Sequence, residues 1–363
     1  GALAMEGRPV AGLVGDESNP DSVGSLHTVY RLLDFANQDL PHDWDPVHRQ
    51  WNGGAMDGFV KEAGSGSPHT MGYFTREELP MLYALADQGA VCDHWHAALL
   101  GPTWPNRYYI HCATSNGRKT NVPAVPVPTS IWDRLKTAGI SAKNYFHDIA
   151  WKAAALLEFD AVPVEDFFTD AAAGTLPNFS LIDPAFIVGA NDDHPAHDVR
   201  LGQALIATVV AALAASPQWS RCLFVLTYDE HGGFFDHVAP PATIDDRAEF
   251  AQLGVRVPSI VLGPHVRQGC VVNRTFEHAS IMRTVETRFG LPILNQRVEA
   301  ANDLSAVIDP RKLSNPSPPP VLPTTQVSLG AVSRMPVDMA RHVEMRTAAD
   351  ALTEELPSDL QAQ

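Results

Sequence analysis

The chain has 363 residues, and 45% of them are hydrophobic, which is enough to bury a large core in one big domain or two. Its 26 Lys and Arg against 42 Asp and Glu give a formal net charge of −16. Such an acidic balance argues against a broad nucleic-acid-binding surface, which would have to be basic. No run of ~20 apolar residues is present, so the sequence predicts no membrane-spanning helix. No signal peptide is visible, and the oligomeric state stays open.

Four cysteines are present, Cys92, Cys112, Cys222 and Cys270. They are too few and too scattered for a disulfide scaffold, and they lack the spacing of a zinc site. Cys222 is expected in the core. Cys92 and Cys112 could pair in an exported protein, and the sequence leaves that open.

Helix and strand patterns alternate from residue 71 onward. A helix is expected after Thr75, which can cap it, and Gly89 is expected to end it. Residues 91–96 are expected to form a short strand with His94 and His96 on one side. Such a pair can bind a metal, although it is more often a polar face.

The later elements follow the same alternation. Helices are expected at 130–138, 166–177 (running into a loop), 199–215 and 277–289, and strands at 141–146, 179–182, 222–226 and 257–262. A strand, a helix and a strand in succession form the parallel crossover unit. We therefore predict an α/β fold, a three-layer α/β/α sandwich around a mostly parallel central sheet.

The most informative stretch is the apolar run 222–226 and the loop after it. Such a run is typical of a strand buried on both faces of a parallel sheet. Asp229 and Glu230 follow it directly, and open α/β sheets bind ligands at the carboxyl ends of their strands. Paired glycines at 232 and 233 allow a sharp turn. Two carboxylates beside a histidine suit a divalent cation, and the alternative is a solvated turn.

Residues 101–107, Gly-Pro-Thr-Trp-Pro-Asn-Arg, hold a hydroxyl on a rigid turn. Thr103 is a candidate nucleophile, since a hydroxyl needs a fixed approach and a neighbouring base or metal. Asn106 and Arg107 could donate hydrogen bonds to anionic oxygens, Arg107 in a bidentate manner. The alternative is an ordinary helix start with Thr103 as its cap, and a helix amino end is itself an anion site.

Three loop histidines are further candidates. His48 follows a Pro-His-Asp-Trp turn and could equally be an ordinary loop residue. His194 stands in the polar segment 191–195, where the following proline holds it extended. His237 follows Asp236 in the loop after the paired glycines.

Three segments together carry a resemblance to a known family. Residues 101–107, 191–195 and 228–238 resemble the bacterial phosphoesterase family, which contains phospholipases C and related acid phosphatases. Each motif alone is moderately specific, and the three in this order are strongly so. The match covers roughly residues 12–292, and the family has an alkaline-phosphatase-like fold, in agreement with the sandwich predicted above.

The resemblance assigns roles to individual residues. Thr103 matches the hydroxyl nucleophile that takes the phosphoryl group. Asp229 and Glu230 match an acidic pair that binds one divalent metal ion, with zinc and calcium as candidates. His194 and His48 match histidines that line the phosphate pocket.

The resemblance also implies a substrate class, with Asn106, Arg107 and His237 as expected substrate contacts. It implies a metal-dependent phosphoric ester hydrolase that acts on a phosphate ester or a phospholipid. Threonine at 103 and Asp-Glu at 229–230 look closer to the phospholipase C branch than to the acid phosphatases, which remain the alternative. A transient contact with a membrane surface and export from the cell are further expectations.

One departure from the family pattern concerns the start of the chain. Family members begin with a buried strand ending in a Glu-Asn pair that supplies metal ligands. This chain starts at Gly1, where that motif would have ended. We therefore expect a central strand and half of the metal site to be missing, which would leave two unpaired strand edges. A relative that binds phosphate esters without hydrolysing them is the resulting alternative.

The domain organisation follows from the same reasoning. We expect residues 1–310 to form the catalytic domain, 311–335 a proline-rich linker, and 336–363 a helix or tail. Residues 339–356 have the pattern of a final amphipathic helix.

Overall fold

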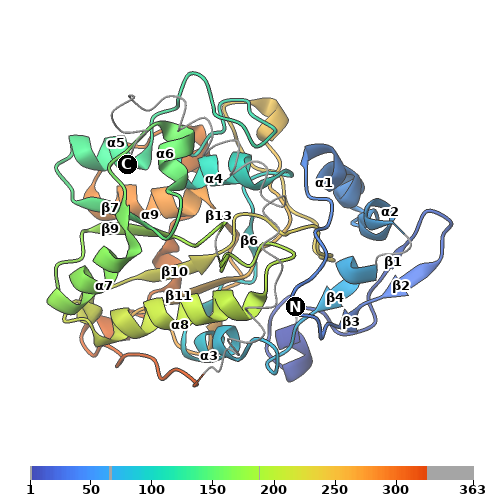
Figure 1. The fold of residues 1–363 in the computed structure, drawn as a ribbon, viewed down its shortest axis with the longest axis horizontal. Coiled ribbons are helices and arrows are strands. Elements are labelled where there is room, and N and C mark those ends of the chain that lie inside the picture. Colours follow the sequence, from blue (N-terminus) through green and yellow to red (C-terminus); the bar gives the residue numbers. More distant parts are fainter. Residues whose placement is uncertain (1, 65–67, 188, 325–363) are drawn as a thin grey trace.

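The computed structural model describes residues 2–64, 68–187 and 189–324, and strands lie at its centre with helices on two sides (Figure 1). Helices α3, α7 and α8 cover one side of the strands, and α4, α5 and α9 cover the other. Helices α1 and α2 stand apart with strands β1 to β4. The predicted α/β class with three layers is confirmed.

The helices have the following bounds: α1 Trp44–Trp51, α2 Phe59–Ala63, α3 Pro80–Gln88, α4 Thr103–Cys112, α5 Ile131–Thr137, α6 Trp151–Leu156, α7 Val164–Ala173, α8 Val199–Ala215, α9 Ala279–Phe289 and α10 Gln296–Ala300. The strands are β1 Ser18–Pro20, β2 Leu26–Thr28, β3 Tyr30–Arg31, β4 Gly72–Tyr73, β5 Ala90–Val91, β6 Trp95–His96, β7 Ala142–Phe146, β8 Val162–Pro163, β9 Phe179–Asp183, β10 Phe224–Thr227, β11 Ser259–Leu262, β12 Cys270–Val271 and β13 Phe276–Glu277.

Two sheets make up the centre of the fold. One has the order β8-β7-β9 with parallel pairing throughout, and the other has the order β10-β11-β5-β12. In the second sheet β11 runs antiparallel to both β10 and β5, and only β12 is parallel to its neighbour. Parallel pairs still outnumber antiparallel pairs among the described strands.

The strand predicted at 222–226 forms, but its predicted neighbour in the sheet is wrong. The sequence suggested a parallel crossover from residues 179–182 through a helix into this strand. The helix α8 forms as expected, but β9 and β10 lie in separate sheets. Strand β10 pairs instead with β11, which returns from the loop at the carboxyl end of β10 and therefore runs antiparallel. The residues of β10 are half-buried and not fully enclosed.

Two apolar layers hold the helices on the strands. On one side Met81 and Leu85 of α3 pack with Ile206 and Val210 of α8 against Ile260 of β11. On the other side a larger cluster joins α4, α5, α6 and α9, with Trp104, Trp132, Trp151 and Met282 among its members. Burial of these large side chains is the main force that fixes the layers.

Helix α5 and strand β7 confirm their predictions, but the helix expected after Thr75 begins later. Helix α3 starts at Pro80, because proline has no amide hydrogen to lose at the first helical position. The Thr75 hydroxyl donates to Glu78 Oε2 at 2.7 Å and caps no helix. The strand expected at 91–96 splits into β5 and β6.

The structure answers the question that the sequence left open for the cysteines. All four cysteines are free, so Cys92 and Cys112 form no disulfide. Cys222 was expected in the core; it is half-buried, packs against the edge of a core cluster and lines a cavity described below.

The chain beyond the main body is described as far as residue 324. Residues 310–313 form a short 3₁₀ turn, and Val321 exchanges two hydrogen bonds with the Gln88 side chain, each 2.7 Å long. The helix expected at 339–356 lies outside the described residues. Among the described residues no helix is long and apolar enough to cross a membrane.

Candidate active site

Thr103 is the first residue of α4, directly after a loop that Asn106 holds in place. The Asn106 side chain accepts from Leu99 N at 3.0 Å and donates to the carbonyl oxygens of Gly101 and Pro102 at 2.9 and 3.1 Å. Asn106 is fully buried by these contacts. The buried Oγ1 of Thr103 has no hydrogen-bond partner among the described residues, and it lies where the helix amino end favours negative charge.

Arg107 lies one helical turn after Thr103, so the two side chains share a face of α4. Its guanidinium forms an ion pair with the fully buried Asp183 at the end of β9. Asp183 in turn accepts from Asn144 Nδ2 at 3.0 Å and from Trp151 N at 3.3 Å. The Nε of Arg107 is buried without a partner among the described residues, so this cation has donor capacity left for a ligand.

Asp229 and Glu230 follow β10, as the sequence predicted. Glu230 Oε2 accepts from Gly232 N at 2.7 Å and lies 3.5 Å from His231 Nδ1. Burial and the neighbouring Glu230 charge raise the pKa of Asp229 to about 7. Burial also opposes ionisation of Glu230, but His42 and His231 outweigh it and lower the pKa of Glu230 to about 2. Two adjacent buried carboxylates that repel each other in this way are suited to share a cation.

Gly233 brings the loop of residues 39–42 against the acidic pair. It has φ +78°, and a Cβ there would lie 2.6 Å from Leu40 Cβ and 2.9 Å from Pro41 O. Only glycine permits this approach. The approach sets His42 beside Glu230, whose charge, together with Asp39, raises the pKa of His42 to about 9 against the lowering effect of burial.

His194 faces His42, with ring centroids 5.3 Å apart. One ligand atom each from Asp39, His42 and His194 lie within 4.8 Å of one another, a grouping that could hold a metal ion. Sequence reasoning did not single out Asp39 or His42. The sequence signal available for them was the polar stretch around Pro41, in which a histidine stands close to two aspartates.

The loop that carries His194 is anchored to the end of β10. Asp193 accepts from Tyr228 Oη at 2.6 Å, and burial raises the pKa of Asp193 to about 7. A Cβ at position 202 of α8 would lie 1.9 Å from Asp193 Oδ1, so Gly202 leaves room for this side chain. The anchor ties the position of His194 to that of Asp229.

One cavity of about 1510 Å³ brings most of the predicted site residues together. Its lining contains six of them: Thr103, Arg107, His194, Asp229, Glu230 and His237. Asn106 is absent from the lining and acts on the loop instead, as described above. The structure therefore assembles residues from α4, from the loop before α8 and from the loop after β10.

His48 lies away from this cavity. Its ring contacts the Trp44 ring at a tilt of 36° with centroids 4.4 Å apart, and its Nδ1 lies 2.7 Å from Trp44 O. Burial lowers the pKa of His48. The structure thus places His42, and not His48, next to His194.

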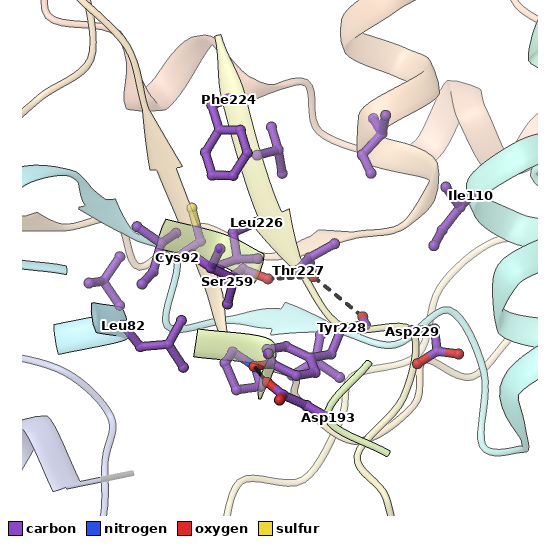
Figure 2. A pocket seen from close by; sticks show the side chains of 18 of the residues that line it. Leu82, Cys92, Ile110, Asp193, Phe224, Leu226, Thr227, Tyr228, Asp229 and Ser259 are labelled. Carbon is purple, nitrogen blue, oxygen red and sulfur yellow. Dashed lines mark hydrogen bonds between the residues drawn. The ribbon is translucent and has the colours of Figure 1, made fainter. Parts of the chain in front are cut away.

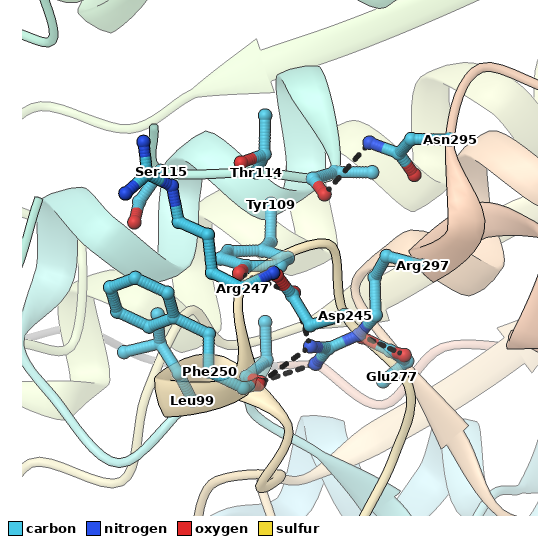
Figure 3. Close-up of polar contacts among 12 residues, drawn as sticks. Leu99, Tyr109, Thr114, Ser115, Asp245, Arg247, Phe250, Glu277, Asn295 and Arg297 are labelled. Carbon is cyan, nitrogen blue, oxygen red and sulfur yellow. Dashed lines mark hydrogen bonds and ion pairs between the residues drawn. The ribbon is translucent and has the colours of Figure 1, made fainter. Parts of the chain in front are cut away.

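A buried ion-pair network supports the loop that leads to Thr103 (Figure 3). Arg297 has no exposed surface and donates to Glu277 Oε1 at 2.7 Å, to Asp245 Oδ2 at 3.0 Å and to Phe250 O at 3.1 Å. It also donates to Ala98 O, in the segment just before the Thr103 turn. The Arg297 side chain thereby links α10 to the segment that leads to Thr103.

The profile of the Phosphoesterase family matches residues 5–292. The chain belongs to this family. The resemblance seen in the three sequence motifs is thereby confirmed.

Two relatives illustrate what the chain is similar to. It is 32% identical over 332 residues to non-specific phospholipase C1 of Arabidopsis thaliana, covering 78% of this chain and 62% of that protein. It is 32% identical over 316 residues to phospholipase C A of Mycobacterium tuberculosis, covering 71% of this chain and 60% of that protein. The chain thus spans about three fifths of the length of these relatives.

Among solved structures, a phosphonate monoester hydrolase from Silicibacter pomeroyi is similar with a TM-score of 0.39 and 15% identity. The similarity covers 62% of this chain and 71% of that one. At this TM-score the likeness carries no argument about activity.

Proposed function

We propose that this chain is a phosphoric ester hydrolase of the phospholipase C type that uses Thr103 as its nucleophile. One observation supports this most directly. The buried, unpartnered Thr103 hydroxyl at the amino end of α4 shares a cavity with Arg107 and with the acidic pair. Phosphoryl transfer needs a positioned nucleophile and stabilisation of negative charge, and these residues supply both.

The proposed chemistry has two steps. The Thr103 hydroxyl gives its proton to a carboxylate of the acidic pair and its oxygen bonds to phosphorus, while the bond from phosphorus to the lipid alcohol oxygen breaks, which leaves a phosphothreonine. A histidine gives a proton to the departing oxygen. Water then gives a proton to that histidine and attacks phosphorus, the bond to Thr103 breaks, and the carboxyl returns a proton to the Thr103 oxygen. The protonated form of His42, favoured by its raised pKa, makes it a suitable donor beside His194.

A divalent metal ion is part of the proposal, and the donor set fits one. Asp229, Glu230 and Thr103 offer carboxylate and hydroxyl oxygens, which hard cations prefer. A bound cation would neutralise charge on the phosphoryl oxygens and lower the pKa of the hydroxyl. Zinc and calcium are both candidates. Arg107 would stabilise the same oxygens through its free Nε.

The substrate class is proposed from the names of the relatives. Both are named as phospholipases C, which supports a phosphodiester substrate with a lipid alcohol as leaving group. The acid phosphatase alternative predicts a phosphate monoester instead.

The decisive experiment is hydrolysis of a chromogenic phosphocholine diester, with and without added zinc or calcium, beside the matching monoester. We expect metal-dependent release from the diester by the full chain. Turnover by Thr103→Ala should fall at least about 100-fold, because without the hydroxyl no covalent intermediate can form. Thr137→Ala, on the exposed end of α5, is the matched control and should keep turnover.

Three results would contradict the proposal. Full turnover by Thr103→Ala would exclude the phosphothreonine. Preference for the monoester would favour the acid phosphatase alternative. Binding of the diester without hydrolysis under any metal condition would favour a relative that only binds phosphate esters.

A further inference from the structure

The loop that joins α4 to α5 exposes large apolar side chains. Val122, Val125 and Val127 of this loop are 39% to 74% exposed. The turn after α6 adds Leu157 and Phe159, of which at least half is exposed. Single exposed apolar residues are ordinary on protein surfaces, whereas a group of them in one place marks a contact site. We call these five side chains the apolar rim.

The two parts of the apolar rim are joined by a hydrogen bond. Ser130, three residues after Val127, donates from Oγ to Glu158 Oε1 at 2.7 Å. Glu158 stands between Leu157 and Phe159 in the sequence. The loop between α4 and α5 and the helix α6 also lie at the same edge of the molecule (Figure 1). The apolar rim is therefore one surface, built from two segments.

The loop between α4 and α5 is held in place by α4. Ala124 N donates to Tyr108 Oη at 2.7 Å, and Asn121 Oδ1 accepts from Trp104 N at 2.8 Å. Trp104 directly follows Thr103, so the loop is attached to the start of the helix that carries the proposed nucleophile. Because the loop is already ordered, contact through its valines costs little further conformational entropy.

The backbone of this loop offers few free polar groups. Positions 123, 126 and 128 are prolines, which have no amide hydrogen. Pro126 O accepts from Asn116 Nδ2 at 2.8 Å, and Val122 N donates to Thr120 O at 2.9 Å. A segment that enters lipid needs its backbone groups satisfied or absent, whereas a partner that pairs as a strand needs them free. The loop therefore suits a lipid surface better than a strand of another protein.

The charge of the loop favours the same partner. Residues 114–129 contain Arg118 and Lys119 and no carboxylate, in a chain whose net charge is −16. Lys119 Nζ lies 2.7 Å from Glu249 Oε2, whereas Arg118 forms no ion pair with a described residue. A guanidinium beside exposed valines can bind the phosphate oxygens of lipid headgroups while the valines enter the apolar layer.

The apolar rim lies outside the active-site cavity. None of its five side chains is among the described residues that line this cavity. Figure 2 shows Ile110 of α4 at the cavity with Asp229. Trp104 and Tyr108, which hold the loop, lie on another face of α4 and pack with α5, α6 and α9. The helix that begins at Thr103 thus has the cavity on one side and the loop on another.

We propose that the apolar rim binds this chain to the surface of a zwitterionic phospholipid bilayer. The valines, Leu157 and Phe159 enter the outer part of the apolar layer, and Arg118 contacts headgroup phosphates. The negative net charge of the whole chain favours a zwitterionic bilayer over an anionic one. The choice of lipid as the partner rests on the proposed function, but the binding itself requires no hydrolysis.

The test is sedimentation of the full chain with phosphatidylcholine vesicles. We expect Val125→Asp and Phe159→Asp each to weaken binding at least about tenfold, because a carboxylate at the rim has to stay in water. Val23→Asp is the matched control, since Val23 is 83% exposed in the turn between β1 and β2 and the substitution adds the same charge. It should bind as the original chain does. Vesicles should also slow hydrogen exchange at the amides of residues 121–129.

Four results would overturn the proposal. The first is equal binding by Val125→Asp, Phe159→Asp and the original chain, and the second is slower exchange only outside residues 121–129. The third is a lower free energy of unfolding for Val125→Asp, since another part of the chain would then cover this valine. The fourth is dissociation of a dimer by Val125→Asp, which would assign the apolar rim to contact between two copies.

Docking and hydrolysis can fail separately. Thr103→Ala should bind the vesicles as the original chain does, because the hydroxyl takes no part in docking. Vesicle binding without hydrolysis of any ester would support the apolar rim and contradict the proposed activity. Hydrolysis of the soluble diester by a chain that does not bind vesicles would support the activity and overturn the apolar rim.

Discussion

The ring of His42 lies edge-on to that of His194, while the ring of His48 contacts Trp44. The sequence pointed to His48 and His194 and passed over His42. What separates them is the close approach of the 39–42 loop to Glu230. The Glu230 carboxylate raises the pKa of His42, whereas burial lowers the pKa of His48.

Replacing His42 should therefore impair the proposed hydrolysis more than replacing His48. We expect His42→Ala to lower kcat by about 100-fold, the usual contribution of a general acid. His48→Ala should stay within a few fold of the unaltered chain. The measurement is steady-state hydrolysis of the diester for both variants, and a larger loss for His48→Ala would exclude His42 as the proton donor.

Arg297 is a buried cation that connects several segments of the chain. It bonds two carboxylates and two carbonyl oxygens with no exposed surface. Removal of such a partner leaves uncompensated charge inside the protein, a larger cost than the ion pair itself is worth.

Arg297→Met should thus destabilise the fold by about 3–5 kcal/mol. The measurement is the free energy of unfolding in urea. Arg311→Met is the matched control, because its side chain is 90% exposed and also pairs with an aspartate, and it should unfold almost as the original chain does. Equal effects of the two substitutions would mean that the Arg297 network contributes no more than a surface pair.

At the scale of elements, the join between β3 and α3 depends on the ionised form of Glu78. This carboxylate pairs with Arg31 at the end of β3 and accepts from Thr75 at 2.7 Å. Burial opposes ionisation, but Arg31 and Thr75 lower the pKa of Glu78 from 4.5 to about 2.

The sign of its pH dependence follows from that shift. A carboxyl whose pKa is lower in the folded chain stabilises the fold above its unfolded pKa, and the contribution disappears as the pH falls towards the folded pKa. The difference in unfolding free energy between the original chain and Glu78→Gln should be full at neutral pH. It should shrink between about pH 4.5 and pH 2. Denaturant titrations across that range test this, and a constant difference would exclude the linkage.

Gly233 joins two loops that are far apart in sequence, since its missing side chain admits the backbone of Pro41. We expect Gly233→Ala to cost about 1–3 kcal/mol through backbone strain and overpacking. Hydrolysis should fall with it, because His42 would move away from Glu230.

The control for this substitution is Gly7→Ala. Gly7 has φ +79°, close to that of Gly233, but a Cβ there would meet nothing within 4 Å. It therefore reports the backbone strain alone, measured by urea unfolding. If both variants lose equal stability and keep activity, the close approach to Pro41 does not position the site.

For the whole molecule, the net charge of −16 should govern contact with lipid surfaces. Long-range repulsion from anionic headgroups is strong at low salt and is screened over about 10 Å at 0.1 M salt. We expect co-sedimentation with phosphatidylcholine vesicles to exceed that with phosphatidylserine-containing vesicles at low salt. The difference in co-sedimentation between the two kinds of vesicle should become smaller as the salt concentration rises. Stronger binding to the anionic vesicles would point to a local basic surface that outweighs the net charge.

Local sequence patterns were sufficient for several elements. Helices were predicted at 130–138 and 199–215, and α5 and α8 form there, because capping and amphipathic periodicity are properties of neighbouring residues. The same holds for Thr103 at a helix start and for Asp229 and Glu230 after a strand. The motif order was also enough to indicate the family that residues 5–292 confirm.

Other features depend on contacts between distant segments. Residues 222–226 have the pattern of a buried parallel strand, yet β10 pairs antiparallel with β11 and borders an apolar cavity. Side-chain hydrophobicity indicates that a strand is covered, but it does not say which backbone edge lies next to it. The choice of His42 over His48 was decided by tertiary packing, because it depends on Glu230, a carboxylate far away in the sequence, lying beside His42.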